Sequence, residues 1–338
     1  MLSVALVGAS GYTGTEALRL ILQHPHMALT ALSAGRAAGI DIAKTTPAFT
    51  GYGLPTPMRF DADLIAERAA YALLGLPHGA AQDATAQLLE RGVKVIDMSA
   101  DHRFSDPALY AQIYAEHAHP TSLAETVYGL PELHRQHIKD TRLVGCPGCY
   151  PTSVILAAWP AVRASLVDTD DIVADCKSGV SGAGRNASAG THYPETAEGL
   201  HAYKTLAHRH APEMSHALGG IKVRFVPHLV PMIRGILATV YIRVPTGTSM
   251  EQVRAVYLKA YADEPFVDVL DVGEHPDPRH VRGTNRCHIG LFLDDDLLVV
   301  QSAIDNLCKG SSGQAIQCFN LMAGLPETTG LLATAIFP

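Results

Sequence analysis

Short apolar runs alternate with segments of helical periodicity over the first 150 residues. The apolar runs predict strands at 2–7, 27–32, 71–76, 93–98 and 142–144. Between them, the periodic segments 16–22 and 80–91 predict helices. Strands that alternate with helices are typical of a parallel sheet with helices on both faces. We therefore expect an N-terminal domain with a doubly wound α/β fold.

The hydrophobic pattern changes after residue 149. A helix is predicted from Tyr150 through Trp159, and longer β-type runs follow at 171–177, 222–226, 236–244 and 297–304. Helical periodicity returns at 250–262 and at 310–324. This pattern predicts an α+β domain on a mixed or antiparallel sheet. We expect residues 1–148 with 308–338 to form the first domain and residues 149–307 the second.

Composition narrows the class of protein. Of the 338 residues, 47% are hydrophobic and 17% are charged, which allows two domains with buried cores. The net charge of -7 argues against nucleic-acid binding through long-range electrostatics. No apolar run approaches the roughly 20 residues that span a bilayer, and the first strand begins without a basic leader. We expect neither a membrane segment nor a signal peptide.

The first strand runs directly into a turn with the pattern Gly8-x-x-Gly11-x-x-Gly14, which opens the first predicted helix. Glycines allow a tight turn and close approach of a pyrophosphate, and the helix N-terminus then holds the anion. A glycine pattern alone is a weak signal. Its position between a strand and a helix at the start of an alternating region makes nucleotide binding the favoured interpretation.

The end of the second strand indicates which dinucleotide binds. NAD sites commonly place an acidic residue there, facing the ribose hydroxyls. This chain instead has Ser33 and, three residues later, Arg36. A hydroxyl and a guanidinium favour the additional phosphate of NADP. The alternative for Arg36 is an ordinary solvated surface arginine.

Cys149 is the candidate nucleophile among six cysteines. The six show neither a disulfide framework nor the spacing of a metal site, so we expect a reduced, cytoplasmic protein without a metal. Cys149 stands at the start of the predicted helix, where backbone N–H groups and the helix dipole favour the reactive thiolate. Cys146 follows a β-like run and is expected to be structural. The other four lie in apolar patterns.

Candidate proton-transfer and anion-binding groups lie in the second half of the chain and after the fourth strand. His208 and His210 alternate in sequence, so in an extended stretch they point the same way, with Glu213 near enough to orient one of them. His228 is a third candidate. Positive charge for an anionic substrate comes from three arginines that follow strand-like runs or glycine loops, which are Arg103, Arg185 and Arg234.

Seven segments together resemble the N-acetyl-gamma-glutamyl-phosphate reductase family of arginine biosynthesis, within the semialdehyde dehydrogenase superfamily. They are residues 7–14, 76–79, 147–152, 178–185, 208–213, 227–236 and 303–310. The resemblance covers nearly the whole chain. It implies a Rossmann domain that binds NADP(H), a catalytic domain that assembles a homodimer or homotetramer, and NADPH-dependent reduction of an acyl phosphate through a thioester on Cys149. His208 matches the family's acid/base histidine.

Motifs and resemblance together predict two further sets of site residues. Substrate contacts are expected at Arg103, Ser178, Arg185, His210, Glu213 and Arg234. Cofactor contacts are expected at Gly8, Ser10, Gly11, Tyr12, Thr13, Gly14, Ser33, Arg36, Pro77, His78, Ser99, Ser181, Gly182 and Asn306.

Other functions are compatible with many of these motifs. An aminoadipyl-phosphate reductase of carrier-protein-dependent lysine biosynthesis shares most of them. An aspartate-semialdehyde dehydrogenase is less compatible, because its cysteine segment reads differently from residues 148–152. A non-catalytic NADP-binding regulator is a third alternative, and the retained cysteine and histidines argue against it.

Overall fold

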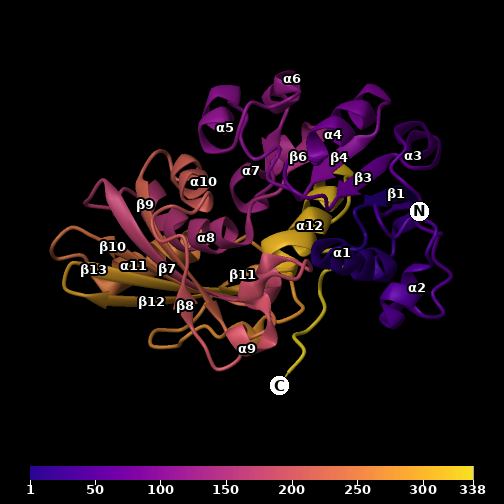
Figure 1. Cartoon of the computed structure of the whole chain (residues 1–338). Coiled ribbons are helices and arrows are strands. Elements are labelled where there is room, and N and C mark those ends of the chain that lie inside the picture. Colours follow the sequence, from indigo (N-terminus) through magenta and orange to yellow (C-terminus); the bar gives the residue numbers. More distant parts are fainter. Residues whose placement is uncertain (338) are drawn as a thin grey trace. The chain divides into compact units, whose positions relative to one another are not determined.

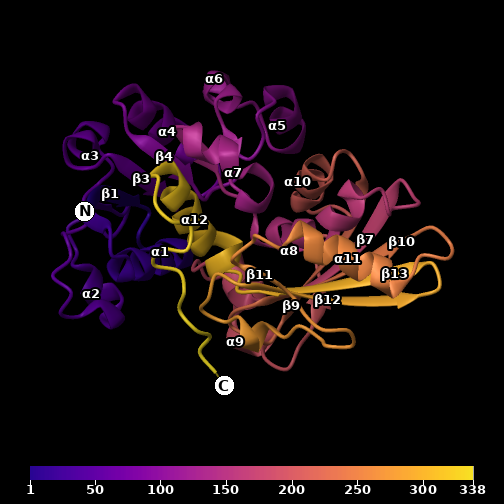
Figure 2. The ribbon, with the colours of Figure 1, turned by 180° about the vertical axis from the view of Figure 1, so that it is seen from behind.

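The structure is a computed structural model that describes residues 1–337, and its chain divides into two units (Figures 1 and 2). Unit 1 contains residues 1–147 and 311–332, and unit 2 contains residues 148–310 and the chain from Ala333 onward. We expected the C-terminal segment in the first domain, which is wrong for the part after Leu332. There the Ile336 N–H bonds to the Arg282 carbonyl, and the Phe337 ring contacts His280.

A parallel six-stranded sheet forms the centre of unit 1, in the order β2-β1-β3-β4-β6-β5. Its strands are β1 (Leu2–Val7), β2 (Met27–Ser33), β3 (Tyr71–Leu74), β4 (Lys94–Asp97), β5 (Val127–Tyr128) and β6 (Leu143–Gly145). The apolar strand sequences bury their side chains on both faces, as a sheet covered on both sides requires. The predicted doubly wound α/β fold is confirmed.

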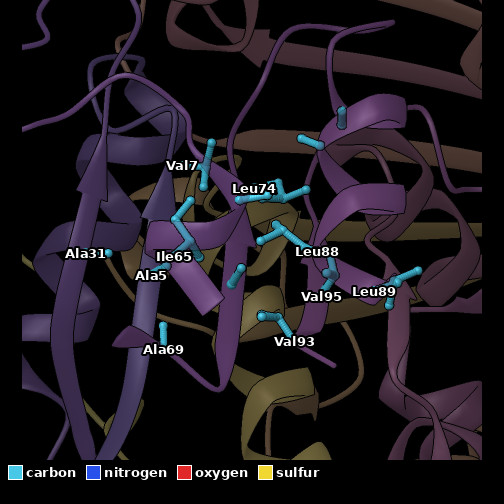
Figure 3. Packing of buried hydrophobic residues seen from close by; sticks show 14 of the residues in the cluster. Ala5, Val7, Ala31, Ile65, Ala69, Leu74, Leu88, Leu89, Val93 and Val95 are labelled. Carbon is cyan, nitrogen blue, oxygen red and sulfur yellow. The ribbon is translucent and has the colours of Figure 1, made fainter. Parts of the chain in front are cut away.

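Helices cover both faces of this sheet. They are α1 (Tyr12–Gln23), α2 (Ile42–Thr45), α3 (Ala62–Arg68), α4 (Ala81–Glu90), α5 (Pro107–Ile113), α6 (Pro120–Ala124), α7 (Pro131–Asp140) and α12 (Gly313–Met322). On one face, Ile65 of α3 and Leu88 of α4 pack against Val7, Leu74 and Val95 of the strands (Figure 3). Both ribbon views place α12, in yellow, beside α1, where Ser312 donates to the Thr13 carbonyl at 2.8 Å (Figures 1 and 2).

Two buried histidines lie beyond the end of β4. His102 is fully buried, and its Nδ1 donates to Asp97 Oδ2 at 2.7 Å. His117 is 7% exposed, and its ring lies edge-on to His102 with centroids 5.3 Å apart. Within residues 1–337 neither Nε2 atom has a hydrogen-bond partner. Burial, followed by the neighbouring His102, lowers the pKa of His117 to about 4.

The lowered pKa of His117 predicts a loss of stability in mild acid. Between the folded pKa of His117, about 4, and its unfolded value of 6.5, the unfolded chain binds the extra proton. Stability is therefore complete above pH 6.5 and decreases as the pH falls toward 4, by on the order of 3 kcal/mol for this group. In His117→Asn, whose side-chain oxygen can still accept the His119 N–H, denaturation midpoints should fall less between pH 7 and 4.5. Equal slopes for the two proteins contradict this.

Unit 2 is built on a mixed sheet with the order β11-β12-β13-β10-β7-β9-β8. Its strands are β7 (Asp171–Gly179), β8 (His201–Ala202), β9 (Lys222–Val230), β10 (Ile236–Arg243), β11 (Val267–Val269), β12 (Cys287–Asp294) and β13 (Leu297–Ile304). Strand pairs β7·β9 and β11·β12 are parallel, and the other pairs are antiparallel. The predicted mixed sheet of the second domain is confirmed.

The helices of unit 2 include one that is almost entirely buried. They are α8 (Cys149–Arg163), α9 (Tyr193–Thr196), α10 (His210–Ala217) and α11 (Met250–Ala260). Figure 2 shows α8 and α11 side by side over the sheet. Tyr257 of α11 donates to the Ala157 carbonyl at 2.7 Å, and on the sheet side the Ser153 and Ser302 hydroxyls lie 2.6 Å apart. These contacts fix α8, and with it the residue at its N-terminus.

Among residues 1–337, no helix is long and apolar enough to cross a membrane. In the same residues, no group of three or more His, Cys, Asp or Glu side chains is arranged to hold a metal ion.

Candidate active site

The glycine turn of unit 1 accepts only glycine at its first and last glycine positions. Gly8 has φ +91°, and a Cβ there would lie 2.4 Å from the Gly75 carbonyl oxygen. A Cβ on Gly14 would lie 2.2 Å from the Gly8 oxygen. The helix α1 starts directly after Gly11, which provides no side-chain cap in this structure. A tight turn that leads into an uncapped helix N-terminus suits a pyrophosphate.

The other predicted cofactor residues of unit 1 gather at the same edge of the sheet. Ser33 ends β2, and its carbonyl accepts the Gly8 and Ala9 N–H groups at 2.9 and 3.1 Å. Pro77 and His78 follow β3, and Ser99 follows β4. Because β1 to β4 are parallel neighbours, their carboxyl ends meet there. Arg36 is exposed after β2, where it is accessible to a ligand.

Some of these side chains are already engaged within unit 1. His78 Nδ1 lies 2.6 Å from Asp101 Oδ1, whose carboxylate also accepts the Gly79 and Ala81 N–H groups. The Ser99 hydroxyl donates to Asp97 Oδ2 at 2.8 Å. Arg103, predicted to contact substrate, is buried and donates through Nε to the Cys146 carbonyl at 3.0 Å. These groups therefore hold the loops after β3 and β4 in a defined shape.

Cys149 is the first residue of α8 and is half-buried, whereas the other five cysteines are buried. None of the six is in a disulfide bond. The residue before it, Gly148, donates its N–H to Glu213 Oε1 at 2.8 Å, and Glu213 is itself 1% exposed. A cysteine at the N-terminus of a buried helix meets the dipole and N–H groups that favour a thiolate. Cys146, by contrast, is 1% exposed.

His208 and His210 lie together near this helix, but not in the extended stretch that we predicted. His210 is the first residue of α10, so helix formation turns the chain between them. Their rings are 4.6 Å apart at 64°, and the His210 N–H donates to His208 Nδ1 at 3.1 Å. A neutral His208 that accepts at Nδ1 carries its proton on Nε2, which makes Nε2 a donor.

An aromatic cluster, consisting of Tyr150, Tyr203 and Phe225, surrounds His208. The three ring centroids lie 6.0, 5.7 and 5.4 Å from that of His208. Tyr203 donates to the Tyr150 hydroxyl at 3.2 Å, and Tyr150 donates to the His228 carbonyl at 3.1 Å. Burial raises the pKa of Tyr203 to about 12 and that of Tyr150 further, so both remain neutral donors. The sequence analysis missed Tyr203, which no nearby motif marks.

His228 lies on the other face of the sheet. Side chains alternate along β9, and Phe225 faces the aromatic cluster, which places His228 opposite. There its Nδ1 is 3.1 Å from Asp175 Oδ1, and Lys177 lies 2.7 Å from the other oxygen of that carboxylate. The structure therefore separates His228 from the two histidines with which sequence analysis grouped it.

The loop after β7 and the end of β13 join through the side chain of Asn306. It donates to the Ser181 hydroxyl at 2.9 Å and accepts the Gly235 N–H at 2.7 Å. Gly182 lies in the same place, because a Cβ there would be 3.2 Å from Ser178 Oγ and 3.8 Å from Asn306 Nδ2. Arg185 is exposed beyond this loop. Ser178, Ser181, Gly182 and Asn306 thus form one group within unit 2.

Comparison with known proteins assigns the family. Residues 3–141 match the semialdehyde dehydrogenase NAD binding domain, and residues 149–306 match the semialdehyde dehydrogenase dimerisation domain. The N-acetyl-gamma-glutamyl-phosphate reductase of Geobacter metallireducens is 46% identical over all of both chains. That of Pseudomonas aeruginosa is 43% identical, again over all of both chains. The chain belongs to the N-acetyl-gamma-glutamyl-phosphate reductase family. The resemblance inferred from the seven segments is confirmed.

Solved structures support the fold of this reductase at lower identity. Aspartate semialdehyde dehydrogenase II from Vibrio cholerae, complexed with ASA, has a TM-score of 0.72 with 17% identity, over 96% of this chain and 98% of that one. The Candida albicans aspartate semialdehyde dehydrogenase with NADP has a TM-score of 0.71 with 16% identity, over the same shares. These likenesses concern the architecture alone.

Proposed function

We propose that this reductase converts N-acetyl-gamma-glutamyl phosphate to N-acetylglutamate 5-semialdehyde and phosphate, with NADPH as reductant, in arginine biosynthesis. The observation that carries the proposal is the accessible cysteine at the N-terminus of α8, in a chain that matches reductases of this name from end to end. The alternative substrate, a carrier-bound aminoadipyl phosphate, has no observation in its favour.

Cys149 is the proposed nucleophile. Its sulfur bonds to the acyl carbon while the bond from that carbon to the phosphate oxygen breaks, and phosphate leaves with the electron pair. The product of this step is a thioester on Cys149. The first N–H groups of α8 lie where they stabilise the oxyanion of each tetrahedral species. Glu213 holds Gly148 and thereby the start of the helix.

His208 is the proposed acid/base group. Its Nδ1 accepts a backbone N–H, so Nε2 is the atom that donates to the alkoxide formed when the thioester is reduced. The aromatic cluster restricts the ring, and His210 and Glu213 act beside it in orientation and substrate binding. Arg103, Ser178, Arg185 and Arg234 are proposed substrate contacts. Collapse of the thiohemiacetal returns the Cys149 thiolate and releases the aldehyde.

NADP(H) is the cofactor, and it supplies the hydride when bound. Residues 8–14 fit its pyrophosphate, because backbone atoms lie where a Cβ on Gly8 or Gly14 would be, so glycine alone permits this tight turn into the uncapped N-terminus of α1. Ser33 and Arg36 are proposed to hold the 2′-phosphate. The remaining proposed contacts are Pro77, His78, Ser99, Ser181, Gly182 and Asn306.

An assay of the reverse reaction, followed by the formation of NADPH, tests this function. The purified chain should reduce NADP in the presence of N-acetylglutamate 5-semialdehyde, and only when inorganic phosphate or arsenate is added. Aminoadipate semialdehyde serves as the matched comparison, with and without its carrier. A higher kcat/KM for the aminoadipyl compound would assign the enzyme to lysine biosynthesis instead. Absence of turnover with both, despite tight NADPH binding, would indicate a regulator.

Arg36→Ala tests the proposed cofactor preference. Losing a hydrogen bond to a charged group costs about 1.5–3 kcal/mol, so the NADPH dissociation constant should rise between about tenfold and a hundredfold. The constant for NADH should barely change, since NADH lacks that phosphate. Fluorescence titration measures both constants. Equal weakening of both would assign Arg36 to the fold, and no change in either would leave Ser33 and backbone amides to hold the phosphate.

The working enzyme is proposed to be a cytoplasmic homodimer or homotetramer. The match to a dimerisation domain supports assembly through unit 2. Helix α8 covers one sheet face, whereas Val173 and Tyr241 on the other face are 37% and 36% exposed. Six cysteines without a disulfide suit a reducing compartment.

A further inference from the structure

A buried carboxylate at the end of β13 holds one of the proposed substrate arginines. Asp305 is fully buried, and Arg234 binds it with two nitrogens, Nε to Oδ2 at 2.9 Å and Nη2 to Oδ1 at 3.0 Å. Bidentate pairs of this kind fix the plane of the guanidinium as well as its position. The Gly283 N–H also donates to Oδ2, at 2.6 Å. Asp305 thus determines where Arg234 lies in unit 2.

The same carboxylate caps the turn that follows it. Oδ1 of Asp305 accepts the N–H groups of Leu307 at 2.8 Å and Cys308 at 3.1 Å. Aspartate side chains stabilise turns in this way by accepting from backbone N–H groups a few residues ahead. The Asp305 carbonyl then accepts the Gly310 N–H at 3.0 Å, which is a bond across five residues, within a π-helical turn at Cys308–Ser312. The side chain of Asp305 therefore acts on Gly310 through the capped turn at Leu307 and Cys308, and its main-chain carbonyl completes that turn.

Gly310 packs directly against the proposed nucleophile. A Cβ on Gly310 would lie 2.9 Å from the Cβ and 3.2 Å from the Cα of Cys149. Such a separation is too short for two carbon atoms, so any side chain at residue 310 displaces Cys149 or the turn. The backbone of Gly310 is consequently in direct contact with Cys149 and limits where this residue can lie at the start of α8.

We propose that Asp305 is a positioning residue of the reaction, which sets both the substrate arginine Arg234 and, through Gly310, the nucleophile Cys149. The inference rests on the proposed function for the meaning of these two groups. The buried side chain of Asp305 then determines the distance between the Arg234 guanidinium, which binds the anion, and the attacking sulfur of Cys149. Misplacement of reacting groups by about 1 Å is enough to cost two orders of magnitude in rate.

Three variants separate the two halves of the proposal. Arg234→Lys keeps the charge but not the bidentate pair, and should raise KM for the acyl phosphate about tenfold without changing the reactivity of Cys149. Gly310→Ala should leave that KM within a few fold, lower kcat at least tenfold, slow alkylation of Cys149 by iodoacetamide, and raise the pH midpoint of alkylation. Asp305→Ala, which removes both the acceptor of Arg234 and the side-chain cap of the turn, should show both sets of effects.

Iodoacetamide reports on Cys149 because the other five cysteines are buried, and Cys149→Ser provides the blank. Asp268→Ala is the matched control, since it breaks an exposed aspartate–arginine pair with Arg286 and should leave every reading unchanged. The dissociation constant for NADPH should be the same in all folded variants. If Asp305→Ala does not fold, Asp305→Glu replaces it. That variant keeps the charge beside Arg234 but shifts the capped turn, so alkylation should slow while KM stays within a few fold.

Two results would overturn the proposal. One is unchanged substrate KM and unchanged alkylation in Asp305→Ala or, for the substitute variant, unchanged alkylation. The other is normal alkylation in Gly310→Ala, which would show that residue 310 does not set Cys149. Failure of the unaltered chain to reduce the acyl phosphate would instead remove the proposed function. The alkylation rates would still decide the link between Asp305, Gly310 and Cys149.

Discussion

Cys149→Ser is expected to lower turnover by roughly 10⁴–10⁶-fold, the range seen when a covalent nucleophile is replaced. Serine is nearly isosteric, so α8 keeps its start and Gly148 keeps its bond to Glu213. The hydroxyl, however, does not ionise near pH 7, and a helix N-terminus cannot lower its pKa enough to change that. Steady-state assays with the acyl phosphate measure the loss, and fluorescence titration should show unchanged NADPH binding.

Cys146→Ala is the paired control. Its side chain is 1% exposed, and the group through which residue 146 holds Arg103 is the backbone carbonyl, which the substitution retains. Most activity should therefore remain, with at most a small loss of stability from the missing sulfur. Substantial turnover in Cys149→Ser, or collapse in Cys146→Ala, would refute the assignment of the nucleophile.

Strands were predicted best from the sequence where the strand itself carries a strong hydrophobic pattern. The predicted runs 2–7 and 297–304 coincide with β1 and β13, because both are mostly apolar stretches in the middle of a sheet. β12 (Cys287–Asp294) escaped prediction although it pairs along the whole of β13. Its His288 and Gly290 weaken the hydrophobic signal, and it is stabilised by its partner strand rather than by its own pattern.

The candidate site also contains some residues that local motifs predict and others that only tertiary packing brings together. Gly8, Gly14 and Cys149 were predicted because their chemistry depends on a turn and a helix start, which a few neighbouring residues encode. The pair Arg234–Asp305 joins residues 71 positions apart, and Gly310 meets Cys149 across a still longer separation. Such contacts arise from tertiary packing and leave no local periodicity. Helix α10 also changed the relation of His208 to His210, since the chain turns at His210.

His208→Asn is expected to lower kcat by about 10²–10⁴-fold, the usual contribution of a general acid or base. Asparagine is a conservative replacement here, because its side-chain oxygen can still accept the His210 N–H that binds Nδ1 in the unaltered enzyme. The α10 start is thereby retained, and only the donor at Nε2 is removed. A pH–rate profile should lose the limb that reports the histidine, while substrate KM changes little.

Two companion variants make the assignment of His208 decisive. His228→Asn alters a histidine on the opposite sheet face, where it faces Asp175, and activity should stay near that of the unaltered enzyme. His210→Asn changes the residue whose ring lies 4.6 Å from His208, so a partial loss is expected through orientation of His208 and substrate. If His208→Asn retains full rate while His210→Asn loses the pH limb, the proton is transferred by His210. The aromatic cluster then serves to exclude water and to hold that second ring, because burial and ring contacts restrict both histidines to the same small region of unit 2.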